Sequence, residues 1–412
     1  MGPMSQPRGE AESTYAYLRL GASLALMTIG GVGMYAMAVA LPQIQAEFGA
    51  SRSSASLPYT LTMIGFGLGG ILMGRLSDRF GVMVPILIGG TCLGGGMIFA
   101  GLAGGLTSFS LTHGLLIGLL GCSATFAPLV SDTSLWFNKH RGMAVAICAS
   151  GNYLAGALWP PILQHFFETS GWRSTYIGVG IFCLVCMLPL AFALRPRPPL
   201  PAAGAVGTQA RGDGGRPLGL SPNTLLVLLG VAGVACCVAM SMPQVHIVAY
   251  CGDLGYGAAR GAEMLSLMLG FGIVSRLASG WICDRIGGLR TLLLGSALQG
   301  LALVLFLPFS GLVSLYVVSA LFGLFQGGLV PSYAIIIREY FSPREAGARV
   351  GVVIMATLFG MALGGWLSGE IFDLTGSYRA AFINGIGWNL LNLSIAFWLL
   401  RRSPARPALQ PA

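Results

Sequence analysis

The stretch 271-FGIVSRLASGWICDRIG-287 decides how the rest of the chain is interpreted. It places one arginine, Arg276, inside an apolar run and closes on Gly280, Asp284 and Gly287. The same closing pattern occurs earlier as 74-GRLSDRFG-81, and every matching position is displaced by the same number of residues. The second half of the chain therefore repeats the first.

The composition around this stretch is that of a membrane protein. Apolar residues make up 55% of the chain and charged residues only 9%, whereas about a quarter of a soluble domain is charged. The 62 glycines lie within apolar stretches and follow no triplet period, as in closely packed membrane helices. We therefore expect an all-α membrane protein.

Twelve apolar segments are long enough to cross a bilayer, which requires about 20 residues each. They form two sets of six, which favours two six-helix bundles, a known plan for transporters. The predicted helices are 18–42, 55–76, 82–104, 107–134, 141–165, 172–193, 224–250, 262–282, 290–308, 311–337, 346–371 and 379–401.

A segment rich in proline, glycine and alanine, without an apolar face, separates the sixth helix from the seventh and is predicted to be a linker. The net charge of +9 comes from cations that gather in alternate loops, which predicts cytoplasmic N- and C-termini by the positive-inside rule. The predicted divisions are a cytoplasmic tail 1–17, a bundle 18–194, a linker 195–222, a bundle 223–402 and a tail 403–412.

Several classes of function find no support. The nine cysteines are scattered and indicate neither a zinc site nor a disulfide framework, so no metal or cofactor is expected. The pattern G-x-G-x-x-G at 65–70 follows no strand and is interpreted as helix-packing glycine. No enzyme motif or nucleic-acid partner is predicted. A polar start without a cleavable signal, and an Arg-rich, Ala-rich and Gly-rich composition, favour a multi-pass protein of a bacterial inner membrane.

The loop after the second helix resembles the signature of the major facilitator superfamily, although Val82 and Met83 stand where basic residues usually follow. Segments 136–161, 171–173 and 359–382 are similar to bacterial members of its monocarboxylate transporter and oxalate/formate exchanger branch. The resemblance implies a twelve-helix carrier in which two halves rock around a central site.

The duplicated motif is predicted to govern that rocking. Its first glycines would let helices approach closely, and its acids and arginines would form a latch between the halves. The alternative is that these charges serve only topology and solubility. The predicted gating residues are Gly74, Asp78, Arg79, Gly81, Gly280, Asp284, Arg285 and Gly287.

Arg276 is the main candidate for substrate binding, because an arginine at mid-membrane costs about 3 kcal/mol unless it meets a cavity or a partner. The resembled branch places an arginine here to bind a carboxylate, for which a planar guanidinium is suited. The alternative is a structural pair with Asp132 or Glu263. The branch commonly has an aspartate where this chain has Gly272 and a lysine in the first helix, which is absent here, so the coupling mechanism stays open.

Other polar residues at membrane depth complete the predicted site. His246 could bind a carboxylate or carry a proton, or could simply pack. Asp132 could carry a proton or pair with Lys139 or Arg141. Glu370 and Asp373 are expected in a gate or in contact with Arg379. The predicted substrate-binding residues are Arg276, His246, Asn152, Tyr153, Tyr35, Tyr333 and His113, and the proton-coupling candidates are Asp132, His246 and Glu263.

The resemblance and the single central arginine together predict a secondary carrier of a small organic anion, foremost a monocarboxylate such as lactate or pyruvate. Proton symport is the first hypothesis, exchange of two carboxylates the second, and a membrane sensor that moves nothing the third. The expected partners are the anion, protons and the lipid bilayer, and a monomer is expected.

Overall fold

The computed structural model describes residues 12–137, 140–197, 217–341 and 343–403. Nearly all of them are helical. The helices are α1 (Thr14–Gly30), α2 (Val32–Phe48), α3 (Arg52–Phe80), α4 (Met83–Gly101), α5 (Leu106–Thr112), η1 (His113–Gly121), η2 (Cys122–Thr125), α6 (Ala127–Trp136), α7 (Arg141–Ser170), α8 (Trp172–Phe192), η3 (Pro217–Gly219), α9 (Pro222–Asp253), α10 (Ala258–Ile286), α11 (Gly288–Leu305), α12 (Leu312–Gln326), α13 (Leu329–Tyr340), α14 (Pro343–Thr375) and α15 (Tyr378–Arg402).

These elements form 12 segments long and apolar enough to cross a membrane, so the predicted fold class is confirmed. Three of the segments are interrupted helices: α1 with α2, α5 through α6, and α12 with α13. The first segment starts at Thr14 rather than at 18, because the Ser13 side chain accepts a hydrogen bond from the Ala16 amide and caps the helix. Most of the predicted tails and linker, and Lys139, lie outside the described residues.

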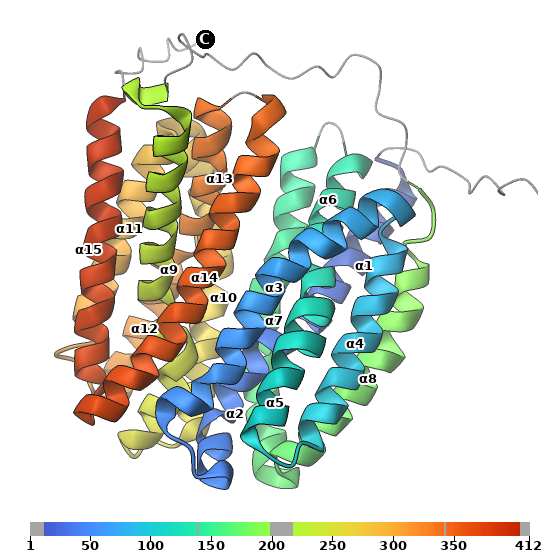
Figure 1. Cartoon of the computed structure of the whole chain (residues 1–412), viewed down its shortest axis with the longest axis vertical. Helices are drawn as coiled ribbons and strands as arrows, with labels where there is room; N and C mark the ends of the chain where they lie inside the picture. Colours follow the sequence, from blue (N-terminus) through green and yellow to red (C-terminus); the bar gives the residue numbers. More distant parts are fainter. Residues whose placement is uncertain (1–11, 138–139, 198–216, 342, 404–412) are drawn as a thin grey trace, which may run out of the picture.

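The helices gather into two bundles (Figure 1), α1 to α8 in one and α9 to α15 in the other. Both α1 and α15 have their chain-terminal ends on one side of the molecule, here called the terminal face. The side where α2 turns into α3 is called the opposite face. The ribbons of the two bundles diverge toward the terminal face and converge toward the opposite face (Figure 1).

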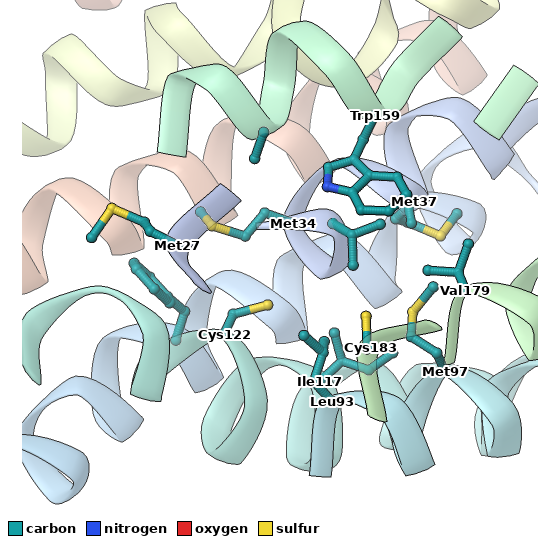
Figure 2. Close-up of a cluster of buried hydrophobic side chains, with 14 of the residues drawn as sticks. Met27, Met34, Met37, Leu93, Met97, Ile117, Cys122, Trp159, Val179 and Cys183 are labelled. Atoms are coloured by element: carbon teal, nitrogen blue, oxygen red, sulfur yellow. The ribbon is translucent and has the colours of Figure 1, made fainter. Parts of the chain in front are cut away.

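Glycine lets helices pack backbone against backbone inside each bundle. A Cβ on Gly94 would lie 2.7 Å from the Gly180 carbonyl oxygen, and a Cβ on Gly180 would lie 2.6 Å from that of Gly94, so α4 and α8 cross where neither has a side chain. The core of the first bundle is rich in methionine (Figure 2), including Met27, Met34 and Met97. Flexible thioether side chains fill the gaps between such closely approaching helices.

The duplicated motif ends in the same backbone geometry in both bundles. Gly81 and Gly287 both end their helices with φ of 85°, a conformation that favours glycine. The internal repeat read from the sequence therefore corresponds to a structural repeat.

Contacts between the bundles run from mid-depth to the opposite face. The pairs in contact include α3 with α14, α7 with α10, and α2 with both α9 and α10. The Thr60 hydroxyl of α3 donates to the Ala362 carbonyl of α14 at 3.1 Å. Nearer the opposite face, a Cβ on Gly369 of α14 would lie 2.9 Å from the Ser53 Cα atom of α3. The bundles are thus closed against each other at the opposite face.

Candidate functional site

Arg276 reaches from one bundle to the other at mid-depth. It lies on α10, eighteen residues after Ala258 and ten before Ile286. Its Nη1 donates to the Ala149 carbonyl at 3.2 Å, and its guanidinium carbon lies 4.4 Å from the centre of the Tyr153 ring. Its buried Nε has no hydrogen-bond partner among the described residues. The cation therefore keeps unused donors within the membrane.

Arg276 forms no ion pair with any carboxylate in the part of the chain that the structure describes. The alternative of a structural pair with Asp132 or Glu263 does not hold here, because each of these acids pairs with a different arginine. A cation without a fixed counter-ion is suited to bind a mobile anion.

Gly272 accounts for the arrangement around Arg276. A Cβ at this position would lie 2.4 Å from Cε1 and 2.5 Å from Cδ1 of Tyr153, so the aromatic ring occupies the space that a side chain would take. The same ring contacts the guanidinium of Arg276, and such a cation–π contact is worth about 0.5–2 kcal/mol. An aromatic face thus stands beside Arg276 where the resembled branch has an acid.

Tyr35 and Asn152 lie close to this unit. Tyr35 of α2 packs against the buried cluster that contains Tyr153, and a Cβ on Gly156 would lie 2.7 Å from its ring. The Asn152 Oδ1 faces the junction of α1 and α2, 3.7 Å from the place of a Cβ on Gly31. The structure therefore brings Arg276, Tyr153 and Tyr35 together, with Asn152 next to Tyr153 on α7.

Two predicted binding residues lie in other parts of the bundles. Tyr333 is fully buried and donates to Asn392 Oδ1 at 2.8 Å, and Asn392 donates to Ser296 in turn. His113 is fully buried at the start of the π-helix η1 and packs 4.6 Å from the Phe109 ring. Both residues contact neighbours of their own bundle.

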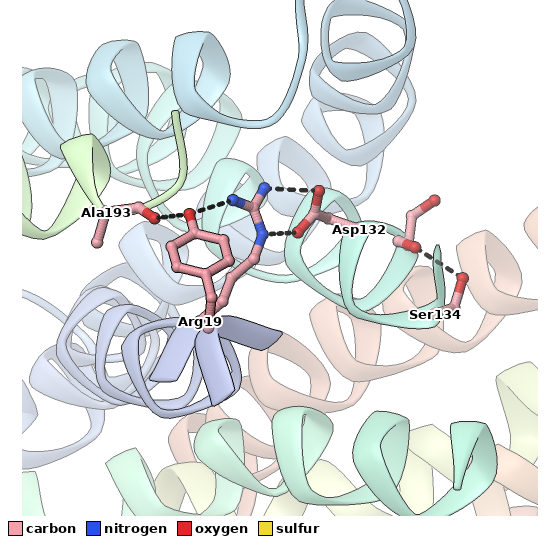
Figure 3. A network of polar contacts seen from close by, with 6 residues as sticks. Arg19, Asp132, Ser134 and Ala193 are labelled. Carbon is pink, nitrogen blue, oxygen red and sulfur yellow. Dashed lines mark hydrogen bonds and ion pairs between the residues drawn. The ribbon is translucent and has the colours of Figure 1, made fainter. Parts of the chain in front are cut away.

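Asp132 is held by an arginine that the sequence analysis did not single out. Arg19 of α1 donates from Nε and Nη2 to the two carboxylate oxygens of Asp132, at 2.8 and 2.9 Å (Figure 3). The two side chains are only 2% and 5% exposed. Among the described residues the partner of Asp132 is therefore Arg19, which the two partners considered from the sequence, Lys139 and Arg141, did not include. Lys139 and the side chain of Arg141 lie outside what the structure describes.

The Arg19 pair joins three elements near the terminal face. Arg19 also donates to the Tyr15 hydroxyl at 3.1 Å, and that hydroxyl donates to the Ala193 carbonyl after α8 at 2.5 Å (Figure 3). Its guanidinium lies 4.6 Å from the centre of the Trp136 ring. The sequence did contain a signal for this pair. Arg19 lies just inside the first apolar span, where a cation needs a partner such as the buried Asp132.

Glu263 lies at the start of α10, near the opposite face. It pairs with Arg260 at 3.0 Å and accepts a hydrogen bond from the Tyr316 hydroxyl. Both members of the ion pair are about half exposed, which makes the pair weak.

His246 has two partners within its own bundle. Its Nε2 lies 2.8 Å from the Gly365 carbonyl oxygen and its Nδ1 lies 3.1 Å from the Tyr378 hydroxyl. The residue is fully buried. In this arrangement neither ring nitrogen is left over for a ligand.

The predicted latch residues of the duplicated motif do not hold the bundles together here. A Cβ on Gly74 or Gly280 would meet no atom within 4 Å, so the expectation that they permit close helix approach is wrong. Asp78 and Asp284 are exposed and form no ion pair within the described ranges. The motif stands where the bundles diverge, so its charges face no partner in the other bundle.

A different set of charges joins the bundles at the opposite face. Arg52 Nη2 contacts Asp253 at 3.1 Å and its Nη1 donates to Tyr378 at 3.0 Å. The Asp373 carboxylate accepts from the Arg52 and Ser53 amides, at 2.8 and 2.7 Å. Asp373 therefore caps α3 of the other bundle, and the expected contact with Arg379 is replaced by this one.

The model of the Major Facilitator Superfamily matches residues 22–319 and 274–412. Monocarboxylate transporter 13 of Rattus norvegicus is 30% identical over 310 residues, which cover 75% of this chain and 71% of that protein. Monocarboxylate transporter 11 of Mus musculus is 25% identical over 397 residues, covering 92% and 86%.

Bacterial proteins are similar as well. An uncharacterized MFS-type transporter, YcxA of Bacillus subtilis, is 27% identical over 345 residues, covering 82% of this chain and 83% of that protein. The crystal structure of a bacterial homolog of the human lysosomal transporter Spinster, inward-facing and occupied, superposes with a TM-score of 0.73 at 17% identity, covering 96% of this chain and 100% of that one. These relatives and structural neighbours are membrane transporters and not enzymes.

Proposed function

The chain belongs to the major facilitator superfamily, in its monocarboxylate branch, and on that premise we propose that it carries a small monocarboxylate, such as lactate or pyruvate, together with a proton. The observation that supports the proposal is Arg276, a cation between the bundles with unused donors and no carboxylate partner among the described residues. The anion would supply the missing counter-ion.

In the proposed cycle the anion enters between the bundles and pairs with the Arg276 guanidinium, which the Tyr153 ring holds in place. Tyr35 would line the same space. The closed opposite face and the diverging terminal face correspond to one of two states that the rocking of the bundles would exchange. Binding the anion at one central arginine fits one carboxylate group better than two.

The proposed orientation places the terminal face in the cytoplasm, because the arginines of the duplicated motif and of the C-terminal helix end gather there. The proposed location is a bacterial inner membrane, and the proposed unit is a monomer. The proposed divisions remain those of the sequence: bundles 18–194 and 223–402 joined by the linker 195–222.

Exchange of one carboxylate for another is the second candidate, and the surroundings of Gly272 favour it. The Tyr153 ring fills the place where an acid would hold a proton beside the arginine. If the anion alone neutralises Arg276, the empty carrier would have to move an unpaired charge, which slows its return and favours exchange.

Proteoliposomes containing the full chain test both candidates. Symport predicts uptake of labelled lactate driven by an inward proton gradient, and exchange predicts uptake only into vesicles preloaded with a carboxylate. Arg276→Ala should weaken anion binding by roughly 10- to 100-fold, the value of a charge-assisted hydrogen bond. Arg379→Ala, an exposed arginine at the opposite face, is the matched control. Full transport by Arg276→Ala, or no transport of any carboxylate, would overturn the proposal.

A further inference from the structure

The opposite face is closed by a set of five polar side chains, here called the opposite-face latch: Arg52, His246, Asp253, Asp373 and Tyr378. Arg52 belongs to the first bundle and the other four belong to the second. Its guanidinium bonds to Asp253 and Tyr378, and it lies 4.6 Å from the centre of the Phe372 ring. All direct polar contacts of the latch between the bundles therefore involve Arg52 or the start of its helix.

The hydrogen bonds of the latch have a fixed direction. The Gly365 carbonyl can only accept, so His246 Nε2 carries a hydrogen and donates to it at 2.8 Å. In a neutral ring Nδ1 is then an acceptor, and the Tyr378 hydroxyl donates to it at 3.1 Å. The Tyr378 oxygen in turn accepts from Arg52 Nη1 at 3.0 Å. Every donor in this series of hydrogen bonds meets an acceptor only while His246 is neutral.

A second proton on His246 would break this order. Nδ1 would become a donor facing the Tyr378 oxygen, which already accepts from Arg52, and the tyrosine hydrogen would lose its acceptor. The new positive charge would also lie one hydroxyl away from the Arg52 guanidinium, and both side chains are buried, at 0% and 7% exposure. Like charges in a buried site repel strongly because little water screens them.

The other charged groups around His246 offset this effect only in part, because the Asp373 carboxylate favours a positive charge on the histidine whereas Arg52 opposes it. Asp373 of α14 is engaged by the two amides at the start of α3, and Asp253 of α9 by Arg52. Tyr250 of α9 presents its ring to Tyr378, 5.5 Å away between centres. From α3, the cation Arg52 faces the histidine through Tyr378. Both acids thus already hold partners, and Arg52 is the charge that reaches His246 through the Tyr378 hydroxyl.

We propose that His246 is a proton-binding residue whose protonation opens the opposite-face latch. The inference rests on the proposed function only in treating the latch as one gate of a carrier. It assigns the proton to a residue away from Arg276, which resolves how a chain with Gly272 in place of an acid can couple an anion to a proton. Protonation on that side would open the gate and admit the anion to Arg276.

Hydrogen exchange measured by mass spectrometry on the full chain in detergent tests the proposal without any substrate. The Arg52 and Ser53 amides donate to Asp373, so the exchange of peptides covering 50–56 reports latch opening. After correction for the chemical exchange rate, we expect these peptides to exchange about tenfold faster at about pH 5.5 than at about pH 8, the range in which histidines titrate.

His246→Gln keeps a donor for Gly365 and an acceptor for Tyr378 but cannot gain a charge, so its exchange should not respond to pH. His165→Gln, an exposed histidine on α7 of the other bundle, should respond as the wild type does. Tyr378→Phe removes the hydroxyl between His246 and Arg52, and we expect it to reduce the response as well. This second variant decides the question if His246→Gln does not fold.

A wild-type latch that exchanges equally at both pH values would overturn the proposal, as would a full response in His246→Gln or Tyr378→Phe. The outcome is separable from that of the transport assay. A chain that opens its latch at low pH but moves no carboxylate would support this inference and refute the proposed function. A chain that carries lactate with a latch insensitive to pH would do the reverse.

Discussion

Arg19 and Arg276 both lie within membrane-spanning helices, and their surroundings differ in one respect. Arg19 meets both oxygens of Asp132 within its own bundle, at 2.8 and 2.9 Å. Arg276 meets a carbonyl and an aromatic face of the other bundle and no described carboxylate. Arg19 is buried and Arg276 is partly buried, and only the first site contains its own counter-ion.

The difference separates a structural charge from a functional one. A neutral pair within one bundle need not change when the bundles move against each other, and it joins α1, α6 and α8 into one body. An anion that binds an unpaired cation between the bundles stabilises it, and release of the anion removes that stabilisation. Substitutions that remove the counter-ion from Arg19, or give one to Arg276, test this distinction.

The largest effect is expected at Asp132. Asp132→Ala would leave Arg19 buried without its partner, and we expect the free energy of unfolding to fall by about 3–5 kcal/mol, as for other broken buried pairs. Unfolding of the purified chain in a denaturing detergent titration measures this loss. Binding of the anion by the fraction that remains folded should be unchanged, because the pair does not contact Arg276.

A double variant sharpens this prediction. Arg19→Met with Asp132→Leu removes both charges and keeps most of the volume, so it should regain most of the lost stability. Glu263→Ala, which breaks a half-exposed pair, should cost at most about 1 kcal/mol. A double variant as unstable as Asp132→Ala would mean that packing, and not the uncompensated charge, caused the loss.

The sequence predicted the fold and the repeat well because both depend on patterns along the chain. Apolar length defined 12 spans, and the motif ending at Gly81 and Gly287 predicted a repeat that has the same φ in both copies. Helix ends were less predictable. The chain begins its first helix earlier than its apolar pattern suggests, because the Ser13 side chain accepts a capping hydrogen bond from the Ala16 amide.

The sequence predicted the site only in part, because pairing depends on which helix faces lie together. Arg276 and Tyr153 could each be chosen by depth, but nothing in the pattern linked Gly272 to the Tyr153 ring. Arg52 looked like an ordinary loop cation, yet its neighbours Asp253 and Asp373 come from more than 200 positions away along the chain. Such long-range contacts leave no local periodicity.

The next largest effect is expected when Arg276 receives a counter-ion of its own. Gly272→Asp places a carboxylate one helical turn before the arginine, where it displaces the Tyr153 ring and pairs with the guanidinium. Anion affinity should fall by roughly 10- to 100-fold, since the substrate then competes with a fixed charge. Competition by unlabelled lactate in a counterflow assay measures the change.

Two variants isolate the cause of that loss. Gly272→Ala adds the Cβ that meets Tyr153 but no charge, and it should lose less affinity than Gly272→Asp. Gly347→Asp adds the same charge at an exposed position near the start of α14, where nothing lies within 4 Å, and it should leave affinity unchanged. Equal losses in the alanine and aspartate variants at position 272 would show that the displaced ring, and not the charge, is responsible.

The smallest effect is expected at Tyr153, whose ring supports the Arg276 guanidinium without neutralising it. Tyr153→Leu removes the aromatic face, and because a cation–π contact is worth about 0.5–2 kcal/mol, anion affinity should fall by roughly 2- to 30-fold. Tyr153→Phe keeps the face and should stay close to the wild type in the same counterflow assay. A phenylalanine variant as weak as the leucine variant would instead assign the role to the hydroxyl, making Tyr153 a direct donor to the anion.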